Sequence, residues 1–260
     1  MIKKCEAIVL RSINYRDESK ILTLYTREFG KLSAIAKGCR GPRSKYASAF
    51  ELGSHIAVVL YKKTTREVQN ISEASLKTPF LGITASLERL RVMLQILELV
   101  RLATEEEEPQ PKIFYLLLES LRQIDVTKKN FINIFFFFQT HLVSLLGFKP
   151  SFTECVISGK DIMQALDAED CRELVLLPER GGVALRKEAE RLALSGKPIS
   201  IQAFRWIQCL NETPLHSVEN LYLQHALGNE VAQILDSYLR FHIENLPALR
   251  SQEIFNALTR

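Results

Sequence analysis

The sequence predicts an α+β protein with two parts, a small closed β-barrel followed by an all-helical region. Two features of the apolar pattern lead to this fold class. Up to about residue 76 the apolar residues form five short strand-like runs, whereas from residue 84 they recur with the 3.6-residue period of a helix. Hydrophobic residues make up 47% of the 260 residues, which is enough to fill real cores, so we expect an ordinary globular protein.

The five predicted strands cover residues 6–11, 21–26, 31–36, 50–61 and 68–76. Alternation is clear in the second and third strands, where one face of each carries a regular set of side chains: Leu22, Leu24 and Thr26, then Leu32, Ala34 and Ala36. Residues 28–30 between them predict a hairpin turn. Because closure removes exposed sheet edges, five short strands favour a closed barrel, and the oligonucleotide/oligosaccharide-binding (OB) barrel is the natural candidate.

Five helices are predicted after the barrel, at residues 84–100, 112–124, 130–146, 199–210 and 218–243. The segment 105–111 has four glutamates and two prolines and cannot continue a helix, so it predicts a solvated loop. The helix at 130–146 is apolar nearly all round and is expected at the centre of a helical core. Residues 148–183 follow neither period and predict a compact insert between helices.

Positive charge is concentrated in the first third of the chain. Residues 1–80 carry fifteen Lys or Arg and seven Asp or Glu, a balance of +8, whereas residues 81–260 sum to −4. A local field of this kind attracts a polyanion whatever the net charge of +4. Charge alone leaves nucleic acid and an anionic membrane surface both open as partners.

One basic stretch, residues 31–45, contains no acidic residue. Its five cations are Lys31, Lys37, Arg40, Arg43 and Lys45. Glycines and a proline between residues 37 and 46 disfavour helix and strand, so we expect a surface loop that contacts phosphates without reading sequence, with Tyr46 available to stack on an unpaired base. The alternative is a loop that serves only solubility.

The sequence gives no positive sign of catalysis. All three Gly-Lys pairs lack the glycine five residues earlier that a phosphate-cradling loop needs, and the five histidines are dispersed. Five scattered cysteines indicate reduced thiols. No stretch is typical of a signal peptide or a spanning helix, so we expect a non-enzymatic cytoplasmic protein.

The chain resembles the RecO family of recombinational DNA repair mediators in the order of four motifs. These are AIVLR at residues 7–11, YRDESKIL at 15–22, LYTREFG at 24–30 and AKGCR at 36–40. Further on, LLGFKP at residues 145–150 and the pair Gly181-Gly182 stand where that family leaves its central helix and completes a small insert. The resemblance spans most of the chain and is strongest over residues 6–42.

The resemblance implies an OB barrel, a helical domain and a small zinc-finger-like insert, in a protein without enzymatic activity. We therefore expect a barrel at residues 1–80, a helical domain at 81–147, the insert at 148–186 and C-terminal helices at 187–260 that pack on the helical domain. Family members bind single- and double-stranded DNA, anneal complementary strands, work with RecR, contact the C-terminal tail of single-strand DNA-binding protein and help to load RecA. Such a protein is expected in the cytoplasm, at the nucleoid.

Matching the motifs puts the DNA-facing role on Arg11, Lys37 and Arg40, and charge extends it to Arg43 and Lys45. The insert departs from the family. Many members carry four thiolates that would close a tetrahedral zinc site. Here the four positions hold Cys155, Ser158, Leu185 and Glu188, so we expect no metal and an insert held by packing, with Cys155 and Cys171 as buried small hydrophobic residues.

A second hypothesis is an adaptor whose helical half binds partner peptides while the barrel is only a scaffold. An apolar groove near the helices at 112–146, with basic rims, would suit an acidic, hydrophobic tail. The candidate rim cations are Lys112, Arg122, Lys128 and Lys129, which are equally compatible with an ordinary protein surface.

Overall fold

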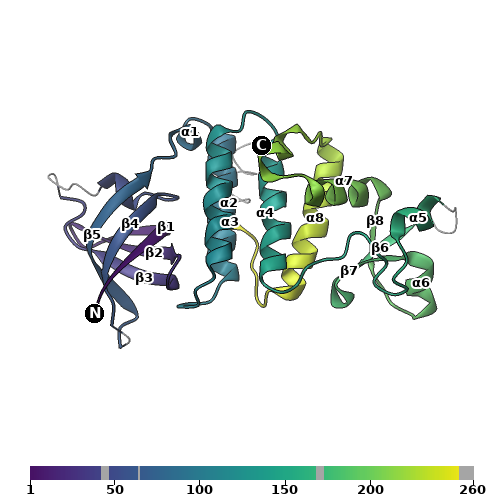
Figure 1. Ribbon diagram of the computed structural model, residues 1–260, viewed down its shortest axis with the longest axis horizontal. Coiled ribbons are helices and arrows are strands. Elements are labelled where there is room, and N and C mark those ends of the chain that lie inside the picture. The colour runs from purple at the N-terminus through teal and green to yellow at the C-terminus, as the bar shows by residue number, and fades with distance from the viewer. Residues whose placement is uncertain (42–46, 64, 168–172, 252–260) are drawn as a thin grey trace. The chain divides into compact units, whose positions relative to one another are not determined.

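The computed structural model describes residues 1–41, 47–63, 65–167 and 173–251. The chain divides into two compact units, which are treated separately below. The first comprises Met1–Thr127 and the segment that starts at Ala248, and the second comprises Lys128–Pro247. Figure 1 labels the helices and strands of both.

The first unit begins with a closed five-stranded barrel in the order β1-β2-β3-β5-β4 (Figure 1). Its strands are β1 Ile2–Tyr15, β2 Ser19–Thr26, β3 Gly30–Ala36, β4 His55–Tyr61 and β5 Val68–Thr78. All neighbouring strands are antiparallel except β3 and β5. The predicted barrel is therefore confirmed, and the alternating residues of β2 and β3 are buried in it, among them Leu22, Leu24, Leu32 and Ala34.

The fourth strand is shorter than predicted. The sequence pattern indicated a strand over residues 50–61, but Ala47–Phe50 forms a 3₁₀ turn (η1) and β4 starts only at His55. The chain reverses in between at Gly53, whose φ of +76° is a left-handed conformation that favours glycine. Apolar content alone did not reveal this turn.

Three helices complete the first unit: α1 Leu81–Thr84, α2 Leu87–Ala103 and α3 Pro111–Val126. The Ser86 side chain caps α2 by accepting from the Arg89 amide, and Pro111 occupies the first turn of α3, where its missing N–H costs nothing. After the second unit the chain returns to α2, where the Glu98 carboxylate accepts from the backbone N–H groups of Arg250 and Ser251.

The loop between α2 and α3 is solvated on one side only. The side chains of its four glutamates are exposed as predicted. Its backbone, however, pairs with the barrel, since the Glu107 amide donates to the Lys31 carbonyl over 2.8 Å. A Cβ on Gly30 would stand 2.1 Å from the Glu108 carbonyl oxygen, so a glycine is required where the loop crosses β3.

The second unit is built on α4 Ile132–Leu145, α7 Ile201–Glu212 and α8 His225–His242. Most of α4 is buried, as predicted, and Phe136 meets Trp206 of α7 edge to face. The helix predicted over residues 218–243 is interrupted: Leu215–Asn220 is a 3₁₀ helix (η3) and α8 begins at His225. The Asn133 amide donates to the carbonyls of Val218 and Leu221, which stabilises the break.

The predicted insert forms a three-stranded sheet together with a strand that follows it in the chain; the order is β7-β6-β8, from Gly182–Leu185, Leu174–Leu177 and Lys197–Ile199, so the sheet extends beyond residue 186. It also contains α5 Ile162–Asp167, the 3₁₀ turn η2 Pro178–Arg180 and α6 Arg186–Arg191. Within the described part of the chain, every helix is too short or too polar to cross a lipid bilayer.

Candidate nucleic-acid interface

A β-bulge in β1 places Arg11 on the outside of the barrel. Ala7 and Val9 point into the core, and strict alternation would send Arg11 there too. The pairing with β2 instead shifts between Val9 and Arg11, so that Arg11 lies opposite Thr23 on the outer face and is exposed. The bulge thus turns a predicted DNA-facing residue to the surface.

Lys37 and Arg40 are exposed on the turn that follows β3. Between them Cys39 is buried in the barrel core, where desolvation raises the pKa of its thiol, and Gly38 takes a left-handed φ of +65°. Burial of one side chain and solvation of its neighbours fix the orientation of the turn. The structure therefore brings these two predicted cations to one end of the barrel.

The turn after β3 contacts the turn between β1 and β2. The Arg40 amide donates to the Glu18 carbonyl over 3.0 Å, and the Arg40 guanidinium donates to the Arg16 carbonyl over 3.3 Å. Arg16 in turn lies over the ring of Tyr15, with 5.2 Å from its guanidinium carbon to the ring centroid. Arg16 and Tyr15 are exposed and join the site, although charge counting had not selected them.

A sequence signal for these two residues existed. Tyr15 and Arg16 stand at a polar turn between two alternating strands, where an aromatic residue beside a cation is typical of a nucleic-acid contact. The same turn carries the exposed acids Asp17 and Glu18, which lower the local net charge. Arg43, Lys45 and Tyr46, also predicted to contact DNA, lie outside the described residues.

Lys31 does not belong to the basic surface, which corrects the interpretation of residues 31–45 as one DNA-gripping stretch. Its side chain is buried, and its ammonium group donates to the carbonyls of Arg101 and Thr104 at the end of α2. Desolvation lowers the pKa of Lys31, opposed by the charges of Glu106 and Glu105. Lys31 is therefore buried at a helix C-terminus, 4.0 Å from the Glu106 carboxylate, and is not part of the exposed basic surface.

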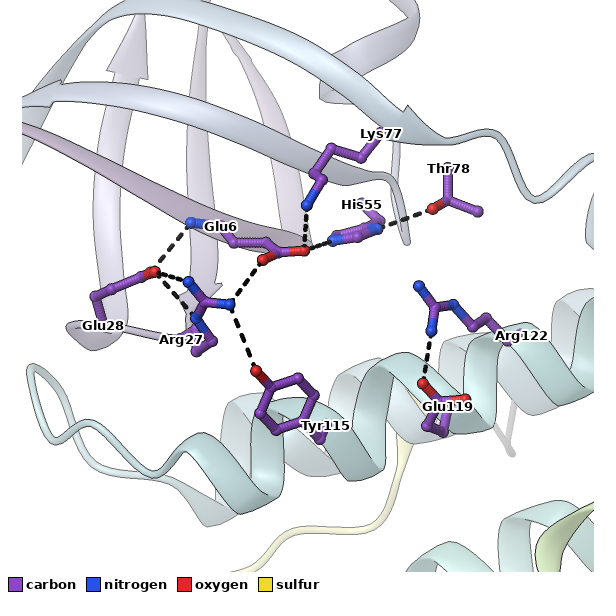
Figure 2. Close-up of polar contacts among 9 residues, drawn as sticks. All are labelled: Glu6, Arg27, Glu28, His55, Lys77, Thr78, Tyr115, Glu119 and Arg122. Atoms are coloured by element: carbon purple, nitrogen blue, oxygen red, sulfur yellow. Dashed lines mark hydrogen bonds and ion pairs between the residues drawn. The ribbon is translucent and has the colours of Figure 1, made fainter.

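A second cluster of charges surrounds the Glu6 carboxylate on β1 (Figure 2). Oε1 of Glu6 lies 2.6 Å from Nε2 of His55 and 2.7 Å from Nζ of Lys77, and Oε2 lies 3.1 Å from the Arg27 guanidinium. Arg27 also contacts the Tyr115 hydroxyl of α3 at 3.4 Å. We interpret this cluster as a connection among strands β1, β4 and β5 and helix α3.

The protonation states follow from the surroundings of this cluster. Burial lowers the pKa of His55, opposed by the hydrogen bond that its ring donates to Glu6, so the neutral ring is favoured at pH 7. Burial would raise the pKa of Glu6, but hydrogen bonds with Lys77 and His55 outweigh it and the pKa is lowered. Nε2–H of His55 then donates to Glu6, while Nδ1 accepts from the Thr78 hydroxyl at 3.0 Å.

The rim cations of the adaptor hypothesis, Lys112, Arg122, Lys128 and Lys129, are all exposed. In the first unit the Arg122 guanidinium lies 2.6 Å from the Glu119 carboxylate (Figure 2). In the second unit Lys128 and Lys129 are exposed, and the Lys128 amide is bound by Glu219. These contacts are those of an ordinary charged surface.

The insert contains a polar cluster at the positions of the family's zinc ligands. The Cys155 thiol donates to the Glu188 carboxylate over 2.9 Å, Ser158 hydrogen-bonds the same carboxylate, and the Lys160 ammonium lies 3.9 Å away. Burial would raise the pKa of Glu188, but the hydrogen bonds from Cys155 and Ser158 outweigh it and the pKa is lowered. Cys155 is buried, as predicted, yet it acts as a donor as well as a small hydrophobic residue.

These residues do not fit a structural zinc site. Leu185, at the third ligand position, is a buried aliphatic side chain with no donor atom. A cluster of three or more His, Cys, Asp or Glu residues is absent from the part of the chain that the structure describes. Cys171, the remaining thiol of the insert, lies outside that part.

Comparison with known proteins gives matches over nearly the whole chain. Residues 1–80 match the family described as Recombination protein O N terminal, and residues 85–253 match Recombination protein O C terminal. The chain is 51% identical to a protein named DNA repair protein RecO from Chloroherpeton thalassium, over 99% of both chains. It is 38% identical to the protein of the same name from Chlorobium limicola, over 96% of both chains.

Proposed function

Because the chain belongs to the RecO family of DNA repair proteins, we propose that it binds single- and double-stranded DNA without sequence specificity through one end of its barrel. The observation that carries this proposal is the exposure of Arg11, Lys37 and Arg40 on the outer surface of the barrel, with the Arg40 guanidinium bound to the turn that contains Arg16. Cations that neutralise phosphates release condensed counterions, which favours DNA of any sequence.

The proposal extends to the role of that binding in repair. A protein that holds DNA by its backbone leaves the base edges free, so it is suited to promote annealing of complementary strands. We propose that it does so, and that it acts with RecR and the C-terminal tail of single-strand DNA-binding protein to help load RecA. Its place of action would be the nucleoid in the cytoplasm, with DNA and not a membrane as the polyanion.

We also propose that the protein works without covalent chemistry and without a metal. The charges around Glu6 are satisfied by partners within the barrel and α3, and the polar cluster of the insert lacks the donor set for zinc. Labelled DNA incubated with the protein and Mg²⁺ should stay intact. Metal-dependent cleavage of that DNA would contradict a purely binding role.

The salt dependence of DNA binding tests the main proposal. On single strands each phosphate contact contributes about 0.7 to the slope of log K against log salt, so five contacts from Arg11, Lys37, Arg40, Arg43 and Lys45 give a slope of about −3.5. The double variant Lys37→Ala/Arg40→Ala should reduce its magnitude by about 1.4.

A matched control removes two exposed cations from the second unit, Lys187→Ala/Arg205→Ala. This variant should keep the wild-type affinity and slope. If the barrel variant also kept both, the assignment of DNA binding to this end of the barrel would be wrong.

A further inference from the structure

The two compact units are joined by two crossings of the chain. The chain leaves the first unit between Thr127 and Lys128 and returns to it between Pro247 and Ala248. Units of one chain move relative to each other unless something restrains them. A single crossing allows rotation about its own bonds, whereas two crossings must move together. The strength with which each crossing is held therefore decides how freely the units move.

The first crossing is fixed immediately on both sides. In the first unit the Thr127 carbonyl accepts from the Arg89 guanidinium over 2.6 Å, and the Thr127 hydroxyl accepts from the Gln123 amide over 2.9 Å. In the second unit the Lys128 backbone amide donates to the Glu219 carboxylate over 3.0 Å. Three different side chains thus hold two consecutive residues, and no single one of them carries this crossing.

The second crossing leads into a short segment at the end of the described chain. Before it, in the second unit, the Leu246 carbonyl accepts from the Arg240 guanidinium over 3.0 Å. After it, the chain enters the segment 248–251, which belongs to the first unit and is called the strap. Leu249 and Ser251 of the strap are buried. The strap is therefore docked on the first unit and does not lie free in solvent.

The strap is bound to α2 through one carboxylate. Oε1 of Glu98 accepts from the Arg250 amide over 3.1 Å, and Oε2 accepts from the Ser251 amide over 3.0 Å and the Ser251 hydroxyl over 2.7 Å. Within the described part of the chain, every hydrogen bond between the strap and α2 ends on this side chain. Opening the strap breaks three hydrogen bonds and uncovers Leu249, which costs far less than unfolding either unit.

We propose that the strap is a releasable latch. Docked on Glu98, it holds the two units together at two crossings. Released, it leaves them joined only between Thr127 and Lys128, about which the second unit moves as a body. Because the latch has a single polar anchor and the first crossing has several, the latch opens first. Release widens the range over which the second unit moves while the barrel stays in place.

Hydrogen exchange at the Arg250 and Ser251 amides tests whether Glu98 holds the strap. Two variants weaken the docking by different means: Glu98→Gln removes the charge of the acceptor, and Leu249→Ala removes buried apolar surface. We expect these amides to exchange about ten-fold faster or more in each variant. The matched control is Glu119→Gln, which changes an exposed glutamate of α3 in the same unit and should leave the exchange unchanged.

The distance between one label in each unit tests whether the strap restrains their movement. Nitroxides are attached to the exposed Cys209 of the second unit and to Glu73→Cys, an exposed position of β5, in a Cys171→Ser background. The other described cysteines are buried. We expect the distance distribution from pulsed dipolar spectroscopy to broaden in Glu98→Gln and in Leu249→Ala, and to keep the wild-type width in the Glu119→Gln control.

Unchanged exchange at Arg250 and Ser251 in both variants would overturn the latch. Faster exchange without a broader distance distribution would show that the strap opens without freeing the units, and would overturn it as well. If the two variants lower the melting temperature of the whole chain, Ser251→Ala, which removes only the hydroxyl bond to Glu98, takes their place in both measurements. Neither readout uses DNA, so failure of the proposed function leaves this result standing.

Discussion

The ammonium group of Lys31 lies 2.8 Å from the carbonyl oxygen of Arg101, at the end of helix α2. The Thr104 carbonyl accepts from the same group. Both carbonyls belong to the last turn of the helix or follow it directly, where no intrahelical donor is available. Lys31 therefore connects the barrel to α2, while Lys37, at the other end of β3, remains exposed.

A pair of methionine substitutions separates these two roles. Lys31→Met leaves buried carbonyls without a donor, so we expect the free energy of unfolding to fall by about 1–3 kcal/mol with no change in the salt slope of DNA binding. Lys37→Met should leave the free energy of unfolding unchanged and should reduce the magnitude of the salt slope of DNA binding by about 0.7. Urea unfolding and salt-dependent binding measure the two effects. If both variants changed DNA binding equally, Lys31 would have to be counted among the residues that bind DNA.

The two left-handed glycines of β3 and its turn are not equivalent. Gly30 has a φ of +68° and no room for a Cβ, whereas Gly38 has a φ of +65° and open space around it. Gly38→Ala should cost about 1–2 kcal/mol of unfolding free energy, from backbone strain alone. Gly30→Ala should lower the free energy of unfolding by more than Gly38→Ala does, because the loop between α2 and α3 must also move. Thermal or urea unfolding of both variants checks this order, and the opposite order would contradict the close packing of Glu108 on β3.

Burial of His55 makes stability depend on pH. Its pKa is lowered from 6.5 in the folded protein, so the unfolded chain binds a proton first as the pH falls. The free energy of unfolding should therefore decrease as the pH falls through about 6.5, by at most about 1.4 kcal/mol per pH unit for this one group. The stability of His55→Gln should depend less on pH between about 7.5 and 5.5. His141 and His242, whose pKa values burial also lowers, leave a residual dependence in the variant. An identical pH dependence in wild type and variant would show that His55 is not the group responsible.

The polar cluster of the insert should stabilise it without metal. Glu188→Ala removes the acceptor of Cys155 and Ser158 and should lower the free energy of unfolding by about 1–3 kcal/mol. The matched control is Glu190→Ala. Glu190 lies two residues further along α6 and its side chain is exposed, so its loss should have little effect on the free energy of unfolding. A chelator should leave the melting temperature of the wild type unchanged. One zinc ion per chain, together with a lower melting temperature after chelation, would contradict a metal-free insert.

Much of the fold was predictable because its signals are local. Alternation in β2 and β3 follows from the two-residue period of a strand, and the buried α4 follows from an apolar sequence on every side of a helix. The turn at Gly53 and the break before α8 were missed because each depends on one backbone conformation or on donors from a distant helix. The apolar content of the sequence indicates neither the turn nor the helix break.

A basic, five-stranded barrel and a helical region were predictable from the residues alone, and so were three of the cations that the structure leaves exposed, Arg11, Lys37 and Arg40. Which outward side chains at β3 face solvent depends on the helix that packs against the barrel. Lys31 and Lys37 are both lysines beside the same strand, and no local pattern separates them. The difference arises because α2, some seventy residues later in the chain, ends over Lys31, so that long-range packing buries this lysine while Lys37 remains exposed.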